Sequence, residues 1–231
     1  MARQLPFSPG ERMEYVGRVR TGVSAHGVLR IDGPADVRGI STWILHSEME
    51  GGLAFIRASD HNVSWLDPVR MASLRYSSRE RHVLNKHDEA VEIFPEERRW
   101  TAKGGLEGSL DSDAPLDELS FLYYLRTLPL TGATPLSVSR HFDSGRNPTD
   151  VRVLGREEIE VGAGRFHAVI VEMRVRDARR YKGEGVIRVS LSDDACRLIL
   201  RLESDVPDNG KATLSLSAYS GTRCDRTSQN R

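Results

Sequence analysis

The sequence predicts a mainly β protein: a single curved antiparallel sheet or open barrel wrapped around one buried helix at residues 113–128. Three observations predict this fold class. Apolar and polar residues alternate with a two-residue period along most of the chain. The segments between the alternating runs are short and rich in turn-forming residues. One stretch in the middle has the apolar spacing of a helix instead.

The alternating runs indicate half-buried strands. In residues 196–204, CRLILRLES, leucines at every second position share one face and the arginines share the other. The connections in the second half are DSGRNP, GAG, DARRYKG, DDA and VPDNG, which suit hairpins between antiparallel neighbours. Residues 51–68 are more ambiguous, and they could form a short helix followed by a strand that ends at Asp67 and Pro68.

Residues 115–130, PLDELSFLYYLRTLPL, are the most apolar stretch of the chain. Asp113 is a suitable N-cap, Pro115 suits the first turn, and Pro129 is expected to stop the helix. Apolar residues cover most of the circumference of the predicted helix, which is typical of a buried one. We expect this helix to cover the apolar face of the sheet, because such a face has to be buried.

Three residues of this helix are candidate ligand contacts: Tyr123, Tyr124 and Arg126. A buried arginine needs partners. Arg126 is therefore expected either to form a structural salt bridge to an acid on a neighbouring strand or to anchor a ligand. The tyrosines either pack with their hydroxyls satisfied or line a pocket.

Asp193 and Asp194 lie between two strand-like runs, so they are expected to cap a turn, and one of them could pair with Arg126. The alternative is that the two carboxylates share acid and base roles in a hydrolase. No nucleophile elbow, phosphate-binding loop, dinucleotide fingerprint or zinc-protease motif occurs in the sequence. We therefore expect no enzyme, no cofactor and no metal site.

The charge balance and the lengths of the apolar runs argue against two further classes of protein, nucleic-acid-binding proteins and membrane-spanning proteins. The chain has 33 basic and 33 acidic residues, which argues against a nucleic-acid partner. No run approaches the length of a membrane span, and the N-terminal residues contain no signal-peptide apolar core. On this ground, either the protein is cytoplasmic or a leader peptide has been removed from it. Cys196 and Cys224 are either unrelated thiols or a disulfide.

Several stretches resemble a bacterial family known as domain of unknown function 3108. They are LPFSPGERMEYVG (5–17), NVSWLDP (62–68), LDELSFLYYLRTLPLTG (116–132), GREEIEVGAGRFHAVIVEM (155–173) and LSDDACRLILRLES (191–204). A tryptophan often precedes the last motif in that family, where this chain has Val189 and Ser190. The resemblance implies an exported protein of the cell envelope or periplasm, with a fold similar to the periplasmic lipoprotein carriers. It implies no catalytic residue.

The sequence thus predicts a single domain over residues 1–221 and a polar tail over residues 222–231. The expected function is a non-catalytic binding or carrier module that holds a lipid or another apolar molecule inside the curved sheet. The alternative is a structural or scaffolding envelope protein with a filled interior and no ligand.

Overall fold

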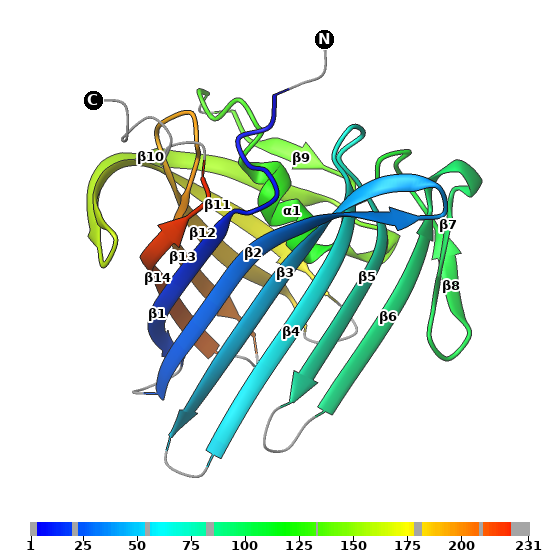
Figure 1. Ribbon diagram of the computed structural model, residues 1–231, viewed down its shortest axis with the longest axis horizontal. Helices are drawn as coiled ribbons and strands as arrows, with labels where there is room; N and C mark the ends of the chain where they lie inside the picture. The colour runs from blue at the N-terminus through cyan, green and yellow to red at the C-terminus, as the bar shows by residue number, and fades with distance from the viewer. Residues whose placement is uncertain are drawn as a thin grey trace.

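One long antiparallel sheet curves around a helix in the computed structural model (Figure 1). The structure describes residues 4–19, 23–53, 56–81, 86–132, 134–177, 182–207 and 210–222. Within these residues the sheet has 14 strands, and every neighbouring pair is antiparallel. The predicted fold class is confirmed.

The first half of the chain is a meander of eight strands. They are β1 (Arg12–Val19), β2 (Val23–Val37), β3 (Ile40–Leu53), β4 (Ile56–Asp67), β5 (Ala72–Arg81), β6 (Lys86–Phe94), β7 (Arg99–Ala102) and β8 (Leu106–Ser109). A 3-10 turn, η1 (Pro95–Glu97), separates β6 from β7. Residues 51–68 hold the end of β3 and all of β4, so the described part of this stretch contains no helix.

The second half is a meander of six strands. They are β9 (Leu136–Val138), β10 (Thr149–Val161), β11 (Gly164–Arg176), β12 (Glu184–Ser192), β13 (Ile199–Val206) and β14 (Gly210–Ser220), and the 3-10 turn η2 (Ser144–Arg146) precedes β10. The α-helix α1 (Glu118–Leu125) lies on the connection between the two meanders.

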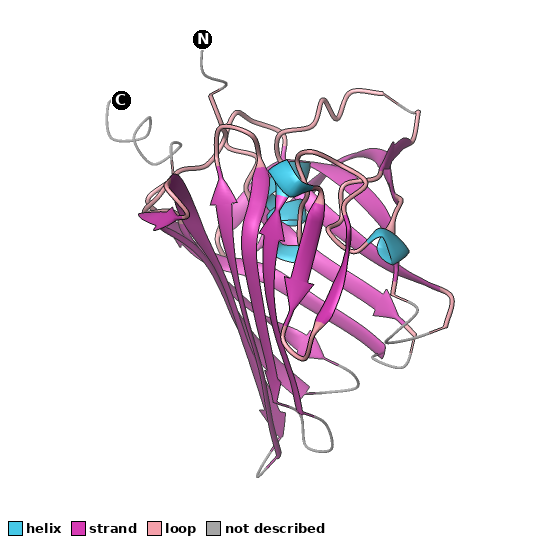
Figure 2. Cartoon of the chain, turned by 90° about the vertical axis from the view of Figure 1, so that its right-hand side faces the viewer, coloured by secondary structure: helices cyan, strands magenta, loops and turns pink. Residues whose placement is uncertain are grey.

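The order of the strands explains where the helix sits. The sheet runs β8-β7-β6-β5-β4-β3-β2-β1-β14-β13-β12-β11-β10-β9, so the first and last strands pair in its interior and β8 and β9 form its two edges. The connection from one edge to the other carries α1. Figures 1 and 2 show α1 enclosed between the two walls of the curved sheet, β1–β6 on one side and β10–β13 on the other.

The helix is shorter than predicted, and its N-cap is Asp117 and not Asp113. The cause is a pairing with a distant segment. The Leu116 amide donates to the Arg140 carbonyl and the Leu116 carbonyl accepts from Phe142, so the backbone at Leu116 is extended. Asp117 is the first position at which the chain can turn into a helix. At the other end, bonds of the 3-10 type close residues 126–128 before Pro129 is reached.

The core fills the space between α1 and the concave face of the sheet. Leu119, Phe121, Tyr123 and Leu125 of the helix are buried there. The strands add apolar side chains from both meanders: Met13, Leu29, Leu45, Leu66, Val171, Val189, Leu200, Leu214 and Leu216. Thr222, which the sequence places in the polar tail, is 1% exposed. Residues 223–231 of that tail lie outside the described residues.

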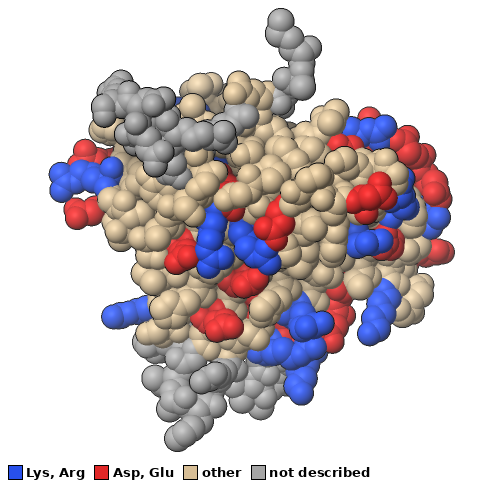
Figure 3. Space-filling model, in the orientation of Figure 1, with Lys and Arg blue, Asp and Glu red and all other residues tan. Residues whose placement is uncertain are grey.

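The outer face is wet and carries charges of both signs. Figure 3 shows basic and acidic side chains intermixed over one side of the molecule. Many of them pair across neighbouring strands, as Arg30 does with Glu48 and Arg188 does with Glu172. This arrangement accounts for the balanced composition, because each positive side chain on such a face can have an acidic neighbour.

Candidate functional site

Asp117 fixes the start of α1 against the sheet. Its carboxylate accepts from the Ser120 amide at 2.8 Å and from the Ser64 hydroxyl of β4 at 2.5 Å. The Ser120 hydroxyl in turn lies 2.7 Å from the Ser73 hydroxyl of β5. Asp117 is fully buried, and this burial raises the pKa of its carboxyl. The cap therefore holds the helix at a fixed place on the concave face.

Arg126 fixes the other end of α1. Its guanidinium forms two hydrogen bonds with the carboxylate of Glu11, at 2.5 and 2.9 Å, and a third with the Cys196 carbonyl at 2.9 Å. The guanidinium also lies over the rings of Phe7 and Tyr123. Both charged side chains are buried. The acid that pairs with Arg126 precedes β1.

The two tyrosines differ in environment. Tyr123 is fully buried, its ring packs edge-on against Phe7, and burial raises the pKa of its hydroxyl. Within the described residues this hydroxyl makes no hydrogen bond. Tyr124 is half-buried, and the Arg140 guanidinium lies 4.4 Å from the centre of its ring.

Asp193 and Asp194 lie in the turn between β12 and β13. Asp194 accepts hydrogen bonds from the backbone amides of Cys196 and Arg197, which is the geometry of a turn cap. Asp193 forms ion pairs with Arg156 and Arg197. Neither carboxylate contacts Arg126 in the structure.

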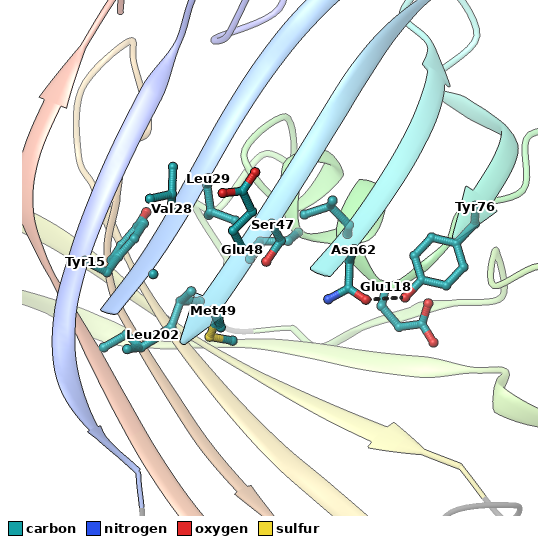
Figure 4. Close-up of a pocket in the computed structure, with 14 residues that line it drawn as sticks. Tyr15, Val28, Leu29, Ser47, Glu48, Met49, Asn62, Tyr76, Glu118 and Leu202 are labelled. Atoms are coloured by element: carbon teal, nitrogen blue, oxygen red, sulfur yellow. Dashed lines mark hydrogen bonds between the residues drawn. The ribbon is translucent and has the colours of Figure 1, made fainter. Parts of the chain in front are cut away.

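A cavity of about 150 Å³ lies between α1 and the concave face of the sheet, and it is partly open to solvent. Most of its wall is apolar. Figure 4 shows the side chains that surround it. The apolar ones are Val28 and Leu29 on β2, Met49 on β3, Leu119 and Leu122 on α1, Leu202 on β13 and Leu214 on β14.

Polar side chains gather at one side of this cavity. They are Ser47 on β3, Asn62 on β4, Tyr76 on β5 and Glu118 on α1. The Tyr76 hydroxyl donates to the Asn62 carboxamide oxygen at 3.1 Å, as the dashed line in Figure 4 shows. None of Tyr123, Tyr124 and Arg126 lines the cavity. Ligand contact by these three residues stays a prediction.

Glu118 connects the cavity to a buried group of charged residues. Its carboxylate accepts from Arg146, whose guanidinium also lies 2.8 Å from an Asp177 carboxylate oxygen. The Nε2 atom of His141 lies 3.6 Å from the same Glu118 oxygen, and its Nδ1 atom accepts from the Asp143 amide. Burial lowers the pKa of His141, and the Asp143 carboxylate opposes that effect.

Cys196 is 2% exposed and disulfide-bonded. Cys224 lies outside the described residues. Because the Cys196 carbonyl accepts from Arg126, the loop that carries this cysteine is also tied to α1. A disulfide of this kind persists in an oxidising compartment.

A family model described as a protein of unknown function, DUF3108, matches residues 21–217. The chain belongs to the DUF3108 family. The resemblance inferred from its motifs is therefore confirmed. No curated protein matches the chain.

One of the solved structures that resemble this DUF3108 protein supports the fold. A β-barrel-like protein of domain of unknown function DUF1849 from Brucella abortus is 11% identical, with a TM-score of 0.62 over 91% of this chain and 96% of that one. A Bacteroides fragilis protein with a YmcC-like fold, described as exported, has a TM-score of 0.35 at 12% identity, covering 95% of this chain and 100% of its own. The second likeness is too distant to carry an argument.

Within the described residues of this DUF3108 protein, no group of three or more metal-ligating side chains gathers. None of its described helices has the length and apolarity needed to span a membrane.

Sequence reasoning missed two parts of the site. They are the polar wall of the cavity, formed by Ser47, Asn62 and Tyr76, and the ion-pair partner of Arg126, which is Glu11. Two of these residues stand inside family-like motifs, Asn62 in NVSWLDP and Glu11 in LPFSPGERMEYVG. Their place inside these motifs was the sequence feature that could have pointed to both residues.

Proposed function

We propose that this protein is a non-catalytic binding or carrier module of the bacterial cell envelope, and that it holds an apolar or acyl-chain ligand inside its curved sheet. The observation that carries the proposal is the cavity beside α1, with its wall of leucine and methionine side chains from both meanders. An apolar wall that is partly open to solvent gains free energy when an apolar group covers it, about 0.8 kcal/mol for each buried CH₂.

The volume limits what the cavity holds. Ligand pockets are typically about 300–1,000 Å³, whereas an apolar cavity of about 150 Å³ takes a group of the size of benzene. A cavity of about 150 Å³ therefore suits a small apolar molecule or one end of an acyl chain. The rest of a long chain would leave through the open side.

Two observations support a place in the envelope. The disulfide at Cys196 suits an oxidising compartment. The family-like motifs resemble those of exported proteins. A periplasmic location follows from this proposal, since the periplasm is the oxidising compartment of such a cell.

The second candidate is a structural or scaffolding envelope protein without a ligand. The tight packing around α1 favours it, because the ion pair of Arg126 and Glu11 and the ring of Tyr123 fill the interior beside the helix. The cavity is also smaller than most ligand pockets. The two candidates differ in one measurable respect, which is whether an apolar ligand competes for the cavity.

Gly27 offers a way to fill the cavity without disturbing the fold. It lines the cavity, and a Cβ atom added there would lie 3.5 Å from the Tyr15 Cβ and 3.6 Å from a Leu214 methyl, which are ordinary contacts. Gly27→Val therefore places a side chain in the space, and Val suits a strand. The matched control is Gly155→Val on β10, where an added Cβ meets nothing within 4 Å.

The measurement is the fluorescence of N-phenyl-naphthylamine, a neutral apolar probe, together with mass spectrometry of lipid extracted from the purified protein. We expect the wild type and Gly155→Val to bind the probe, and Gly27→Val to bind it at least roughly tenfold more weakly at unchanged stability. If all three proteins bound the probe equally, the probe would not occupy this cavity, and the carrier function would be rejected. If the wild type bound no probe and contained no lipid, the scaffolding function would likewise be the one that remains.

A further inference from the structure

Polar and apolar side chains are segregated across the concave face of the sheet. The register places Leu29 of β2 opposite Ser47 of β3, Ser47 opposite Asn62 of β4, and Asn62 opposite Ser78 of β5. In an antiparallel sheet, directly opposed residues point to the same face. One row therefore changes from apolar to polar as it crosses from β2 to β5, and the cavity lies over the point of change.

Three polar groups of this row have no partner within the described residues. The Ser47 hydroxyl and the Asn62 carboxamide nitrogen make no hydrogen bond, although both residues line the cavity and Ser47 is only 8% exposed. The Ser78 hydroxyl is also unpartnered, and that residue is 3% exposed. Buried polar groups are normally hydrogen-bonded, since an unmade bond costs about 1–3 kcal/mol. The Ser47 and Asn62 groups border the partly open cavity, so water or the polar end of a ligand can supply their missing bonds, whereas Ser78 does not line it.

The charges around the cavity select against an anionic ligand. No lysine or arginine is among the described residues that line it, and Glu118 projects a carboxylate towards its polar side. Arg146 already pairs with that carboxylate. Glu48 also borders the cavity, but it belongs to the opposite face of β3, where it pairs with Arg30. Arg126 is neutralised by Glu11 and lies away from the cavity.

We infer that the ligand is a neutral amphiphile whose polar end both donates and accepts hydrogen bonds, as a hydroxyl or an amide does. This inference rests on the proposed binding function and names the ligand class for the same cavity. The polar end contacts Ser47 and Asn62, and the hydrocarbon lies against Leu202 and Leu214 on the far wall. A hydroxyl suits this wall because the amide nitrogen of Asn62 donates and the Ser47 hydroxyl can do either.

A carboxylate or phosphate end is the wrong chemistry for this wall. It would bring a negative charge next to Glu118 in a partly buried space, with no free cation nearby among the described residues. A hydrocarbon with no polar end would leave the Ser47 and Asn62 groups unpartnered. The neutral hydrogen-bonding end is the one that satisfies both conditions.

The test compares ligands that share one chain and differ at the polar end: octanol, octanoate and octylammonium. Each is titrated against the full chain, and displacement of N-phenyl-naphthylamine gives the affinity. We expect octanol to bind roughly tenfold tighter than octanoate, which corresponds to the difference made by about one hydrogen bond to a buried group. Octylammonium is expected to lie between them, since Arg146 already occupies the Glu118 carboxylate.

Two variants test the contacts. Ser47→Ala removes the hydroxyl, and Asn62→Leu removes the carboxamide together with its hydrogen bond from Tyr76. Both leave the apolar wall, so both should bind the probe normally and lose most of the preference for octanol. The control is Ser41→Ala, an exposed serine on the same strand that does not line the cavity. It should keep the preference.

The outcomes separate this inference from the proposed function. Probe binding without any preference for octanol over octanoate, or a preference that Ser47→Ala and Asn62→Leu leave unchanged, overturns the inference and keeps the binding function. Failure of the wild type to bind the probe or any of the three octyl ligands overturns both. A preference that the two variants abolish and Ser41→Ala retains supports both.

Discussion

The guanidinium of Arg126 and the carboxylate of Glu11 form a buried, two-pronged ion pair between residues 115 positions apart in the chain. The pair joins the C-terminal end of α1 to the residue before β1, and the Cys196 carbonyl adds a bond from the β12–β13 turn. Three distant segments thus meet at one side chain.

Removal of one partner is expected to leave an uncompensated buried charge. Arg126→Met and Glu11→Gln should each lower the free energy of unfolding by about 3–5 kcal/mol, as measured by urea denaturation. The double variant Glu11→Leu/Arg126→Met should recover much of that loss, because a buried apolar pair needs no hydrogen bonds. The control is Arg165→Met, which breaks an exposed pair with Glu160 and should cost less than about 1 kcal/mol. Single variants as stable as the wild type would contradict the structural role of the pair.

The helix cap gives a second test, because sequence and structure place it at different aspartates. Asp117→Ala should destabilise the protein by about 2 kcal/mol or more, since it removes the cap and leaves the buried Ser64 hydroxyl without its acceptor. Asp113→Ala, at an exposed position, should change stability by less than about 0.5 kcal/mol. Thermal unfolding followed by circular dichroism distinguishes the two. The reverse order of stabilities would restore Asp113 as the cap.

Two glycines on neighbouring strands should respond oppositely to the same substitution. A Cβ at Gly17 would overlap the backbone carbonyl of Thr213 on the paired strand β14. Gly17→Ala should therefore cost about 1–3 kcal/mol or more. Gly27→Ala meets only ordinary contacts and should be neutral or slightly stabilising. Urea midpoints of both variants decide the matter, and equal midpoints would show that β14 does not pass so close to Gly17.

The buried imidazole of His141 predicts a loss of stability in mild acid. Its pKa is lowered by burial, so the unfolded chain binds a proton that the folded chain resists as the pH falls below about 6.5. The resulting contribution to stability is complete above that pH and lost below it. His141→Gln should therefore lose less stability than the wild type between about pH 7 and about pH 5.

The comparison with the wild type removes the contribution of every other titrating group. His167→Gln, at an exposed position, is the control and should follow the wild-type pH dependence. A pH dependence of His141→Gln that equals that of the wild type would show that this imidazole titrates alike in the folded and unfolded chains.

The sheet was predictable because its signal is local. Each strand of the second meander shows its own two-residue alternation, and each loop carries its own turn residues. The helix was predictable for the same reason, from a run of apolar residues with helical spacing. The first residue of the helix could not be predicted in this way. The extended backbone at Leu116 depends on hydrogen bonds to Arg140 and Phe142, which follow 24 or more residues later in the chain.

The polar wall of the cavity was not predicted, for a related reason. Ser47, Asn62 and Tyr76 stand about 15 residues apart, each in an alternating strand where such a residue is not conspicuous. They become neighbours only through the register of β3, β4 and β5. Glu11 likewise follows Gly10 in a polar stretch typical of an exposed turn, and only the packing of α1 buries it.

The pairing of β1 with β14 also sets the order in which the molecule can be completed. Every other strand finds its neighbour within its own meander, but Arg12 pairs with Ser220. Until residues 210–220 have paired with it, one edge of β1 is an open template for another chain. A chain cut short before β14 would therefore keep that edge exposed for good, even with the rest of the first meander in place.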